Sequence, residues 1–237
     1  MDKLHLDQHI SNKFNEELEE ARKHLMQMGG IVEQQVSNSI TAIIEADSTL
    51  AQSIRERDES VNDMEIDIDE ECAKILALRH PAASDLRFVL AVTKAVNDLE
   101  RIGDEASKIA KQAIELTENG AAPKGYIEIR HIGNLVVSML KKALDAFARS
   151  DADLALEVLQ EDKVVNMEYA SAMREMVTLM MEDPRMISRA LNVMWALRSL
   201  ERIGDHSQNI SEYVIYLVKG KDVRHKKLSK VAKTVKK

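Results

Sequence analysis

The sequence predicts an all-α protein, organised as two tandem three-helix bundles with six long helices and coiled-coil-like packing. Composition is the first reason, because only 3% of the 237 residues are aromatic and there are only 8 glycines and 3 prolines. Sheet folds of this size need many turns and carry more of these residues. The second reason is the helical spacing of apolar residues in almost every window, and the third is an internal repeat.

Breaks in this spacing divide the chain into six predicted helices, which cover residues 7–46, 48–79, 84–118, 125–149, 151–182 and 184–219. In the first helix, Gly29-Gly30 is expected to kink or loosen the helix. The joint to the second helix rests on a modest cap signal around Asp47. The second helix ends ahead of Pro81, and Ser84 is the expected N-cap of the third.

The strongest break is the segment Gly120-Ala-Ala-Pro-Lys-Gly125, which is the best domain boundary. The fourth and fifth helices meet at a modest cap signal around Ser150. The sixth begins with Asp183 as its cap and Pro184 at the first helical position. We therefore expect a first bundle over residues 1–119, a second over 120–220, and a basic, flexible tail over 221–237.

An internal repeat relates the two predicted bundles. The hexapeptide Leu99-Glu-Arg-Ile-Gly-Asp104 returns 101 residues later as Leu200-Glu-Arg-Ile-Gly-Asp205. A second echo pairs Asp58-x-x-Val61-Asn62 with Asp162-x-x-Val165-Asn166. Around each hexapeptide, apolar residues alternate at spacings of three and four, which packs a helix against its neighbours. The chain therefore looks like a duplicated three-helix unit, each copy with its own apolar seam.

Charge is unevenly distributed along the chain. Residues 219–237 hold nine Lys/Arg and one acid, so they contribute +8 to a net charge of −7 and leave −15 on the rest. An acidic body repels phosphate backbones, which argues against a nucleic-acid partner. The basic tail is interpreted as a frayed, solvated terminus rather than a contact for an anionic surface.

The remaining composition and the absence of several known motifs exclude further classes of protein. A single cysteine, Cys72, excludes a disulfide framework and a cysteine-based zinc site. No apolar run approaches the ~20 residues of a membrane span, and the N-terminus lacks a signal-peptide core, so a cytoplasmic protein is expected. There is no P-loop, Gly-x-Gly-x-x-Gly or Gly-x-Ser-x-Gly motif, which favours a non-enzymatic role. Trp195 is interpreted as a packing residue.

The repeated acids are the candidate site. Glu100 and Asp104, like Glu201 and Asp205, are four residues apart and share one helix face. A glycine inside each pair costs about 1 kcal/mol relative to alanine in a helix, which suggests close approach by a helix or an ion. The preceding helices add oxygen ligands. The predicted metal ligands are Glu100, Asp104, Asp58 and Asn62 in the first copy, and Glu201, Asp205, Asp162 and Asn166 in the second.

Clustered carboxylate and carboxamide oxygens suit a hard cation, such as Mg²⁺, Mn²⁺, Ca²⁺, iron or Zn²⁺. The first site is expected to be the stronger one. In the second copy, Tyr169 and Met173 replace the acids that continue the stripe in the first copy as Glu65 and Asp69. Three alternatives remain open at this point: solvated acids paired locally with Arg101 and Arg202, a metal-dependent enzyme that uses the carboxylates, and a purely structural scaffold.

Several motifs together resemble the PhoU family. They are the duplicated Leu-Glu-Arg-Ile-Gly-Asp, the Ala-Ser-Asp-Leu-Arg of residues 83–87, the Asp-x-x-Val-Asn echo and the Met-Gly-Gly of residues 28–30. The resemblance covers residues 2–225. It implies a negative regulator of phosphate uptake and of the phosphate regulon, acting between the ATPase subunit of a phosphate ABC transporter and a sensor histidine kinase.

The resemblance has further implications for assembly and for the site. It implies a homodimer that reaches the membrane only through its partners. It also implies surface metal sites of the form Glu/Asp-x-x-x-Asp, which map onto Glu100 with Asp104 and Glu201 with Asp205.

Overall fold

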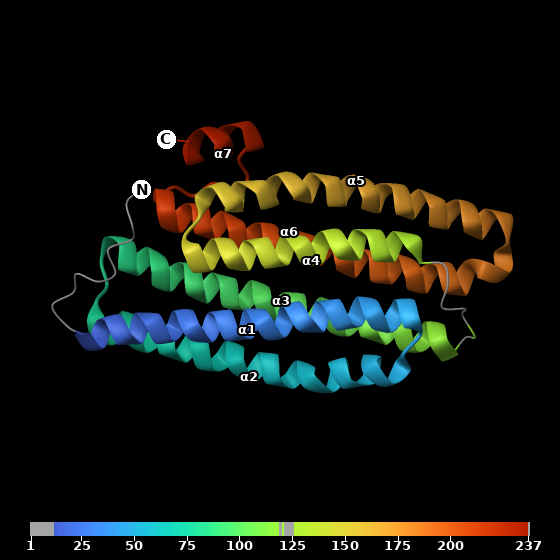
Figure 1. Cartoon of the computed structure of the whole chain (residues 1–237), viewed down its shortest axis with the longest axis horizontal. Helices are drawn as coiled ribbons and strands as arrows, with labels where there is room; N and C mark the ends of the chain where they lie inside the picture. The colour runs from blue at the N-terminus through green and yellow to red at the C-terminus, as the bar shows by residue number, and fades with distance from the viewer. Residues whose placement is uncertain (1–11, 119, 121–125, 237) are drawn as a thin grey trace.

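The computed structural model describes residues 12–118, 120 and 126–236, and every regular element within these ranges is a helix (Figure 1). The elements are α1 Asn12–Glu45, α2 Ser48–Arg79, α3 Ala83–Glu118, α4 Ile127–Arg149, α5 Ala152–Glu182, the 3₁₀ turn η1 Pro184–Met186, α6 Ile187–Lys219 and α7 Leu228–Val235. The predicted all-α class and the six long helices are confirmed. Residues 7–11 and 125, which were also expected to be helical, lie outside the described ranges.

The helix ends follow the predicted caps with one exception. Asp47 accepts a hydrogen bond from the Leu50 amide at 2.9 Å, and Asp183 accepts one from the Arg185 amide at 3.1 Å. The prediction for Ser84 was wrong. The helix already includes Ala83, so the Ser84 hydroxyl lies within the first turn and donates to the Asp85 carboxylate at 3.4 Å. Pro184 opens a 3₁₀ turn before the sixth helix proper begins at Ile187.

The two three-helix units lie side by side along their whole length (Figure 1). Helix α3 packs against α6 and α1 against α4, while α2 and α5 contact only elements of their own half. The predicted seams of α3 and α6 are buried throughout, from Phe88 to Leu116 and from Val193 to Leu217. Because α3 and α6 also face each other, the two seams join into a single continuous hydrophobic core.

Gly29, where the sequence predicted a kink or a loosened helix, has a packing role. Helix α1 is continuous through Gly29-Gly30. A Cβ built on Gly29 would lie 2.6 Å from a methyl carbon of Leu144 on α4, whereas one on Gly30 would meet nothing within 4 Å. Gly133 on α4 is equally tight, since its Cβ would lie 2.9 Å from Ile40. These two glycines allow the close approach of α1 and α4.

The basic tail differs from the flexible segment expected from its charge. Residues Leu228–Val235 form helix α7, which packs against α5 (Figure 1). Val231 and Val235 are buried, together with Val223 in the preceding connection. Val231 and Val235 share one face of the short helix and hold it against the bundle, while the lysines of the helix are exposed.

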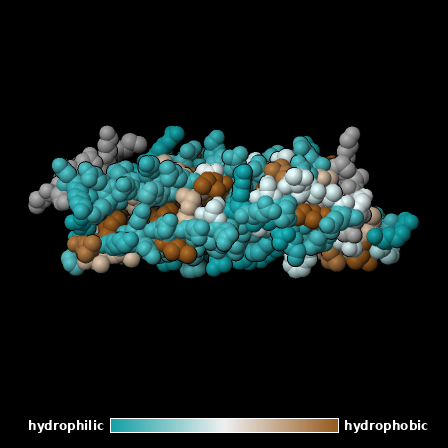
Figure 2. Space-filling view, turned by 90° about the horizontal axis from the view of Figure 1, so that it is seen from below, coloured by the Kyte–Doolittle hydropathy of each residue, from teal (hydrophilic) through white to brown (hydrophobic). Residues whose placement is uncertain are grey.

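The surface is mostly polar. On the face seen from below, hydrophobic side chains form separate spots within a largely hydrophilic surface (Figure 2). None of the helices in the described ranges is both long and apolar enough to cross a membrane.

Candidate metal centres

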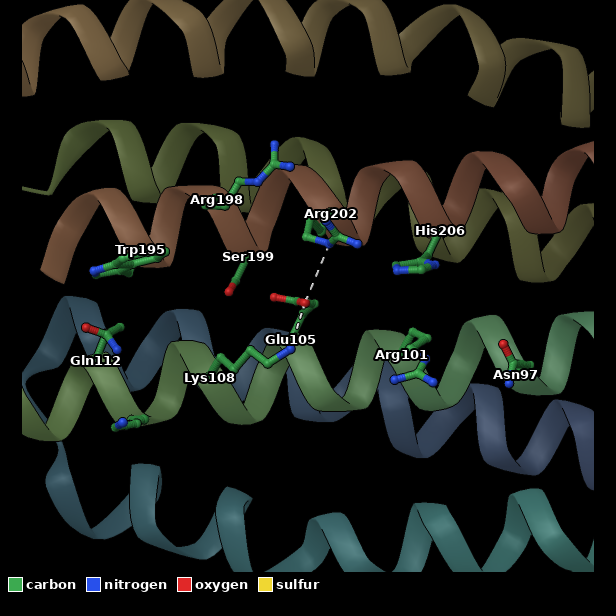
Figure 3. A pocket seen from close by; sticks show the side chains of 11 residues that line it. Asn97, Arg101, Glu105, Lys108, Gln112, Trp195, Arg198, Ser199, Arg202 and His206 are labelled. Carbon is green, nitrogen blue, oxygen red and sulfur yellow. Dashed lines mark hydrogen bonds and ion pairs between the residues drawn. The ribbon is translucent and has the colours of Figure 1, made fainter. Parts of the chain in front are cut away.

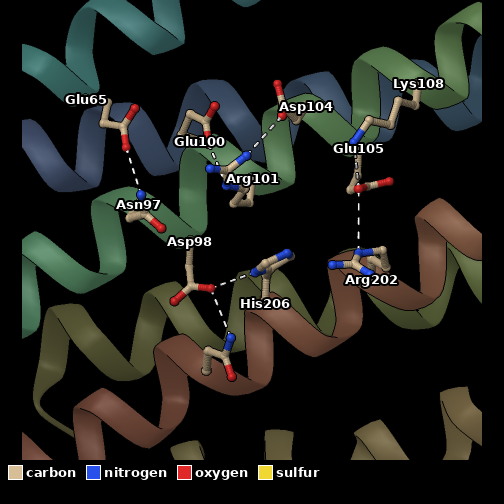
Figure 4. A network of polar contacts seen from close by, with 11 residues as sticks. Glu65, Asn97, Asp98, Glu100, Arg101, Asp104, Glu105, Lys108, Arg202 and His206 are labelled. Carbon is tan, nitrogen blue, oxygen red and sulfur yellow. Dashed lines mark hydrogen bonds and ion pairs between the residues drawn. The ribbon is translucent and has the colours of Figure 1, made fainter.

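The first carboxylate group lies between α2 and α3. The two helices run antiparallel, so Glu65 on α2 accepts a hydrogen bond from the Asn97 amide on α3 at 3.1 Å. Further along α3, the carboxylates of Glu100 and Asp104 project toward the same side (Figure 4). Asp58 on α2 faces them closely enough for its charge to interact with both. The predicted convergence of the acidic stripe on the hexapeptide is therefore present.

Arg101 balances part of this negative charge. Its Nε lies 3.3 Å from Glu100 Oε2, and its Nη1 lies 3.7 Å from Asp104 Oδ2 (Figure 4). The arginine thus bridges the two acids of the motif, as one of the alternatives from the sequence required. The bridge is partial, because Glu100 Oε2 is buried and accepts no hydrogen bond among the described residues.

The electrostatic environment favours neutralisation of the first group. Burial raises the pKa of Asp58, and the neighbouring charge of Asp104 raises it further, while a hydrogen bond from Ser107 acts in the opposite direction. Burial also raises the pKa of Glu100, followed by the charge of Asp104. A raised carboxyl pKa means that the folded protein disfavours the ionised carboxylate. Binding of a proton or of a metal cation would remove this free-energy cost.

The second group repeats this arrangement between α5 and α6. Asp162 is buried, and its burial, followed by the charges of Asp205 and Glu201, raises its pKa to about 6. The Asn166 amide donates to Asp162 Oδ2 at 2.9 Å, but the buried Oδ1 accepts no hydrogen bond within the described part of the chain. Arg198 Nη1 donates to Glu201 Oε2 at 2.8 Å.

The paired glycines open space beside both groups. A Cβ on Gly103 would lie 3.6 Å from Asp58 Oδ1, and one on Gly204 would lie 3.8 Å from Asp162 Oδ1. Both added carbons would also touch the valine of the echo motif, Val61 or Val165, at 3.5 Å. The glycines therefore allow the close helix approach that was predicted, and no side chain of their own lies between the helix and the carboxylate oxygens.

The residue types in both groups suit a hard cation, but their side chains stand too far apart to share one ion. Their oxygens are the ligand type that such ions prefer, and each group contains a buried oxygen that lacks a hydrogen bond. However, no three Asp, Glu, His or Cys side chains among the described residues stand within reach of one ion. Asn166 contacts its carboxylate, whereas Asn62 is exposed to solvent. An ion would have to draw the side chains together.

Sequence reasoning missed the polar contacts that join the two repeats. Buried Asp98 on α3 lies 2.6 Å from His206 Nδ1 and accepts from Asn209 at 3.0 Å, both on α6 (Figure 4). Glu105, also buried, lies 3.7 Å from Arg202. The available signal was a difference between the copies: where the first copy has Asp98 and Glu105, the second has Ser199 and His206. These positions serve the contact between repeats, so they need not match.

The comparisons with known proteins agree with this architecture. A family model described as the PhoU domain matches residues 25–113 and again 129–214. The chain belongs to the PhoU family. The two matched segments fall in the two three-helix units, as expected for an internally duplicated member of the PhoU family.

Similar proteins cover nearly the whole chain. A relative from Pseudomonas putida, named phosphate-specific transport system accessory protein PhoU homolog, is 62% identical over 235 residues, which is 99% of this chain and 92% of the relative. The crystal structure of PhoU from Pseudomonas aeruginosa superposes with a TM-score of 0.86 at 63% identity, covering 88% of this chain and all of that one. The phosphate transport system regulatory protein PhoU from Streptococcus pneumoniae superposes with a TM-score of 0.82 at 32% identity, covering 89% and 99%.

Proposed function

We propose that this chain is a non-catalytic accessory regulator of a phosphate-specific transport system, which restrains phosphate uptake and the phosphate regulon. The observation that carries the proposal is membership of the PhoU family across both repeats. Relatives that align over nearly the full chain are named as accessory or regulatory proteins of phosphate transport. These names favour an adaptor over an enzyme built on the carboxylates.

The proposed partners are the ATPase subunit of a phosphate ABC transporter and a sensor histidine kinase, contacted by a homodimer on the cytoplasmic side. An adaptor transmits a signal only if it binds one state of a partner better than another. The long rigid bundles leave their outer faces free for such contacts. Residues 1–218 carry −15, so a basic partner surface would be complementary, and salt would weaken the association.

A hard cation at each carboxylate group is part of the proposal. In the first group the ligands would come from Asp58, Glu100 and Asp104, and in the second the buried Asp162 would act with the acids of its hexapeptide. The bound ion would supply positive charge between two helices and so remove the cost of burying like charges together. The raised pKa values and the buried oxygens without hydrogen bonds support this assignment.

The proposal is tested in cells by deletion and complementation. Deleting the gene should leave the kinase signalling even when phosphate is plentiful, and the wild-type chain should restore repression. The double variant Glu100→Lys with Asp104→Lys should fail to restore it. A matched control is Glu16→Lys with Glu20→Lys, which places the same charge change at the same spacing on exposed positions of α1.

Both variants must be checked for folding by circular dichroism. If the folded Glu100→Lys, Asp104→Lys variant represses normally and binds its partners at unchanged affinity, the acids are only a solvated face. If the deletion strain itself still represses signalling at high phosphate, the proposed regulatory function is wrong.

A further inference from the structure

A hollow between α3 and α6 gathers cationic side chains on this otherwise acidic protein. Its volume is about 690 Å³, within the usual range for small-molecule sites. Three cationic side chains come from α3 and two from α6, and Glu105 is the single carboxylate in the lining (Figure 3). The cations are Arg101, Lys108, Lys111, Arg198 and Arg202. Such a concentration of positive charge between the two repeats indicates an anionic ligand.

The one carboxylate that lines the hollow already has cationic partners. Glu105 lies 2.9 Å from Lys108 Nζ and 3.7 Å from Arg202 Nε, so its charge is balanced twice. Arg198 Nη1 donates to Glu201 Oε2 at 2.8 Å, and the ion pairs of Arg101 and Lys111 are longer. Arg101 approaches its acids only to 3.3 and 3.7 Å, and Lys111 lies 3.8 Å from Glu115. These distances exceed the ~2.8 Å of a charge-assisted hydrogen bond, and each guanidinium carries five N–H groups.

One end of the hollow offers an aromatic surface. Trp195, interpreted from the sequence as a packing residue, is instead 62% exposed, so that prediction was wrong. Its indole lies at the mouth of the hollow, opposite Gln112 of α3 (Figure 3). Gln112 Oε1 is buried and accepts no hydrogen bond among the described residues. An exposed aromatic face beside an unused acceptor suits a planar ring that carries an amino group.

The distribution of the cations decides the size of the ligand. Arg101 and Lys111 are ten residues apart on one helix, which corresponds to about 15 Å at 1.5 Å per residue. A single phosphate cannot reach across that distance, whereas a chain of phosphates can contact several cations together. A guanidinium can donate two parallel N–H hydrogen bonds to two oxygens of one phosphoryl group. The arginines therefore favour phosphate groups over a diffuse negative charge.

We propose that the α3–α6 hollow binds an anion built as a chain of two or more phosphates, held between cations of both repeats. Two sources share this chemistry, a nucleoside polyphosphate and a bare oligophosphate. With the nucleoside form, the base lies against Trp195 and its amino group donates to Gln112 Oε1. The site adjoins the carboxylate groups, because Arg101 and Arg198 also contact Glu100 and Glu201, but it does not depend on the proposed regulatory function.

The chain supplies its own reporter, because Trp195 is its only tryptophan. The full-length protein is titrated at constant ionic strength with tripolyphosphate, ATP, AMP and orthophosphate, and binding is followed by tryptophan fluorescence and by calorimetry. Tripolyphosphate and ATP should bind saturably, at least tenfold more tightly than AMP or orthophosphate. Equal affinities of ATP and tripolyphosphate assign the site to the bare chain, and tighter ATP binding assigns it to the nucleoside form.

Matched lysine variants locate the binding. Lys111→Glu should weaken tripolyphosphate binding about tenfold. The control is Lys74→Glu on α2, since Lys74 makes a comparable i, i+4 ion pair with Glu70 at 3.5 Å outside the hollow. The control should leave the affinity unchanged. Trp195→Leu, measured by calorimetry, should weaken ATP binding more than tripolyphosphate binding if the base stacks on the indole.

Three results would overturn the proposal. One is the absence of saturable binding by either phosphate chain to the folded protein, which would leave the hollow as a contact surface for a protein partner. Another is binding of orthophosphate as tight as that of tripolyphosphate. The third is an equal loss of affinity in Lys111→Glu and Lys74→Glu, because that would show a general charge effect.

Discussion

The two carboxylate groups share one hexapeptide but have different surroundings, and the difference shows what controls their electrostatics. In the first group, Ser107 donates a hydrogen bond to Asp58 and the ammonium of Lys108 adds a favourable charge. At the matching positions of the second repeat the chain has Gln208 and Asn209. Among the described residues, Asp162 has the Asn166 amide as a hydrogen-bond donor but no cation that lowers its pKa.

The number of acids and the burial of the carboxylates therefore favour different groups as the stronger cation site. The sequence contains more acids near the first hexapeptide, which predicts the stronger cation site there. The larger pKa shift, however, is found in the second group, where burial and two neighbouring carboxylates raise the pKa of Asp162 to about 6. A cation gains most where the ionised carboxylate is least tolerated, which favours the second group as the stronger cation site.

The largest expected effect comes from neutralising Asp162 in metal-free protein. Its folded pKa of about 6 lies above the ~3.9 of an unfolded chain, so the ionised group costs stability above pH 6. Asp162→Asn should therefore raise the free energy of unfolding at pH 8 by up to about 3 kcal/mol. The gain should shrink as the pH falls from 6 and vanish near pH 4, as measured by urea denaturation in a chelator.

Asp58→Asn is the matched variant in the first repeat and should stabilise the metal-free protein less than Asp162→Asn. An equal or larger gain at Asp58 would remove the proposed difference between the two groups. Destabilisation by Asp162→Asn at pH 8 would show that Asp162 is not under electrostatic cost.

A second prediction concerns the contacts between the repeats. His206→Ala removes a partner of the buried Asp98 and leaves Asn209 and Tyr213 hydrogen-bonded to it. The loss should be about 1–3 kcal/mol, the typical cost of an under-satisfied buried acceptor. Thermal or urea unfolding measures it, and Asp98→Asn combined with His206→Ala should recover part of the loss. Unchanged stability of His206→Ala would mean that these contacts do not hold the repeats together.

The smallest predicted effect is at the paired glycines. An added Cβ would make ordinary contacts of 3.5 Å or more at both positions. Gly103→Ala and Gly204→Ala should then each stabilise metal-free protein by about 0.5–1 kcal/mol through helix propensity. Each should also weaken cation binding to its own group. Glycines that served helix packing alone would give alanine variants with unchanged cation affinity.

The long elements of the fold were predictable because their signals repeat over many turns. The apolar seams around Leu99 and Leu200 and the breaks at Pro81 and Pro184 located the main helices. Local features were harder, since Ser84 has the chemistry of a cap but lies one residue inside the helix. The tail was misjudged because its lysines dominate the composition, although Leu228, Val231 and Val235 have the spacing of one helix face.

Site residues were predictable where the two copies agree and not where they differ. The duplication identified Glu100, Asp104, Glu201 and Asp205, and the echo motif added Asp58 and Asp162. The contacts of Asp98 and Glu105 across the repeats depend on how α3 lies against α6, which no single helix pattern specifies. The exposure of Trp195 has the same origin, because only the packed bundle determines which side of α6 stays uncovered.

The number of cations bound per chain tests the central claim most directly. After equilibration with Mn²⁺ and removal of free ion, elemental analysis of the folded wild-type protein should find two ions per chain. Asp58→Asn with Glu100→Gln should leave one ion, Asp162→Asn with Glu201→Gln should also leave one, and the four changes together should leave none. A wild-type protein that retains no more Mn²⁺ than the fourfold variant would contradict the account.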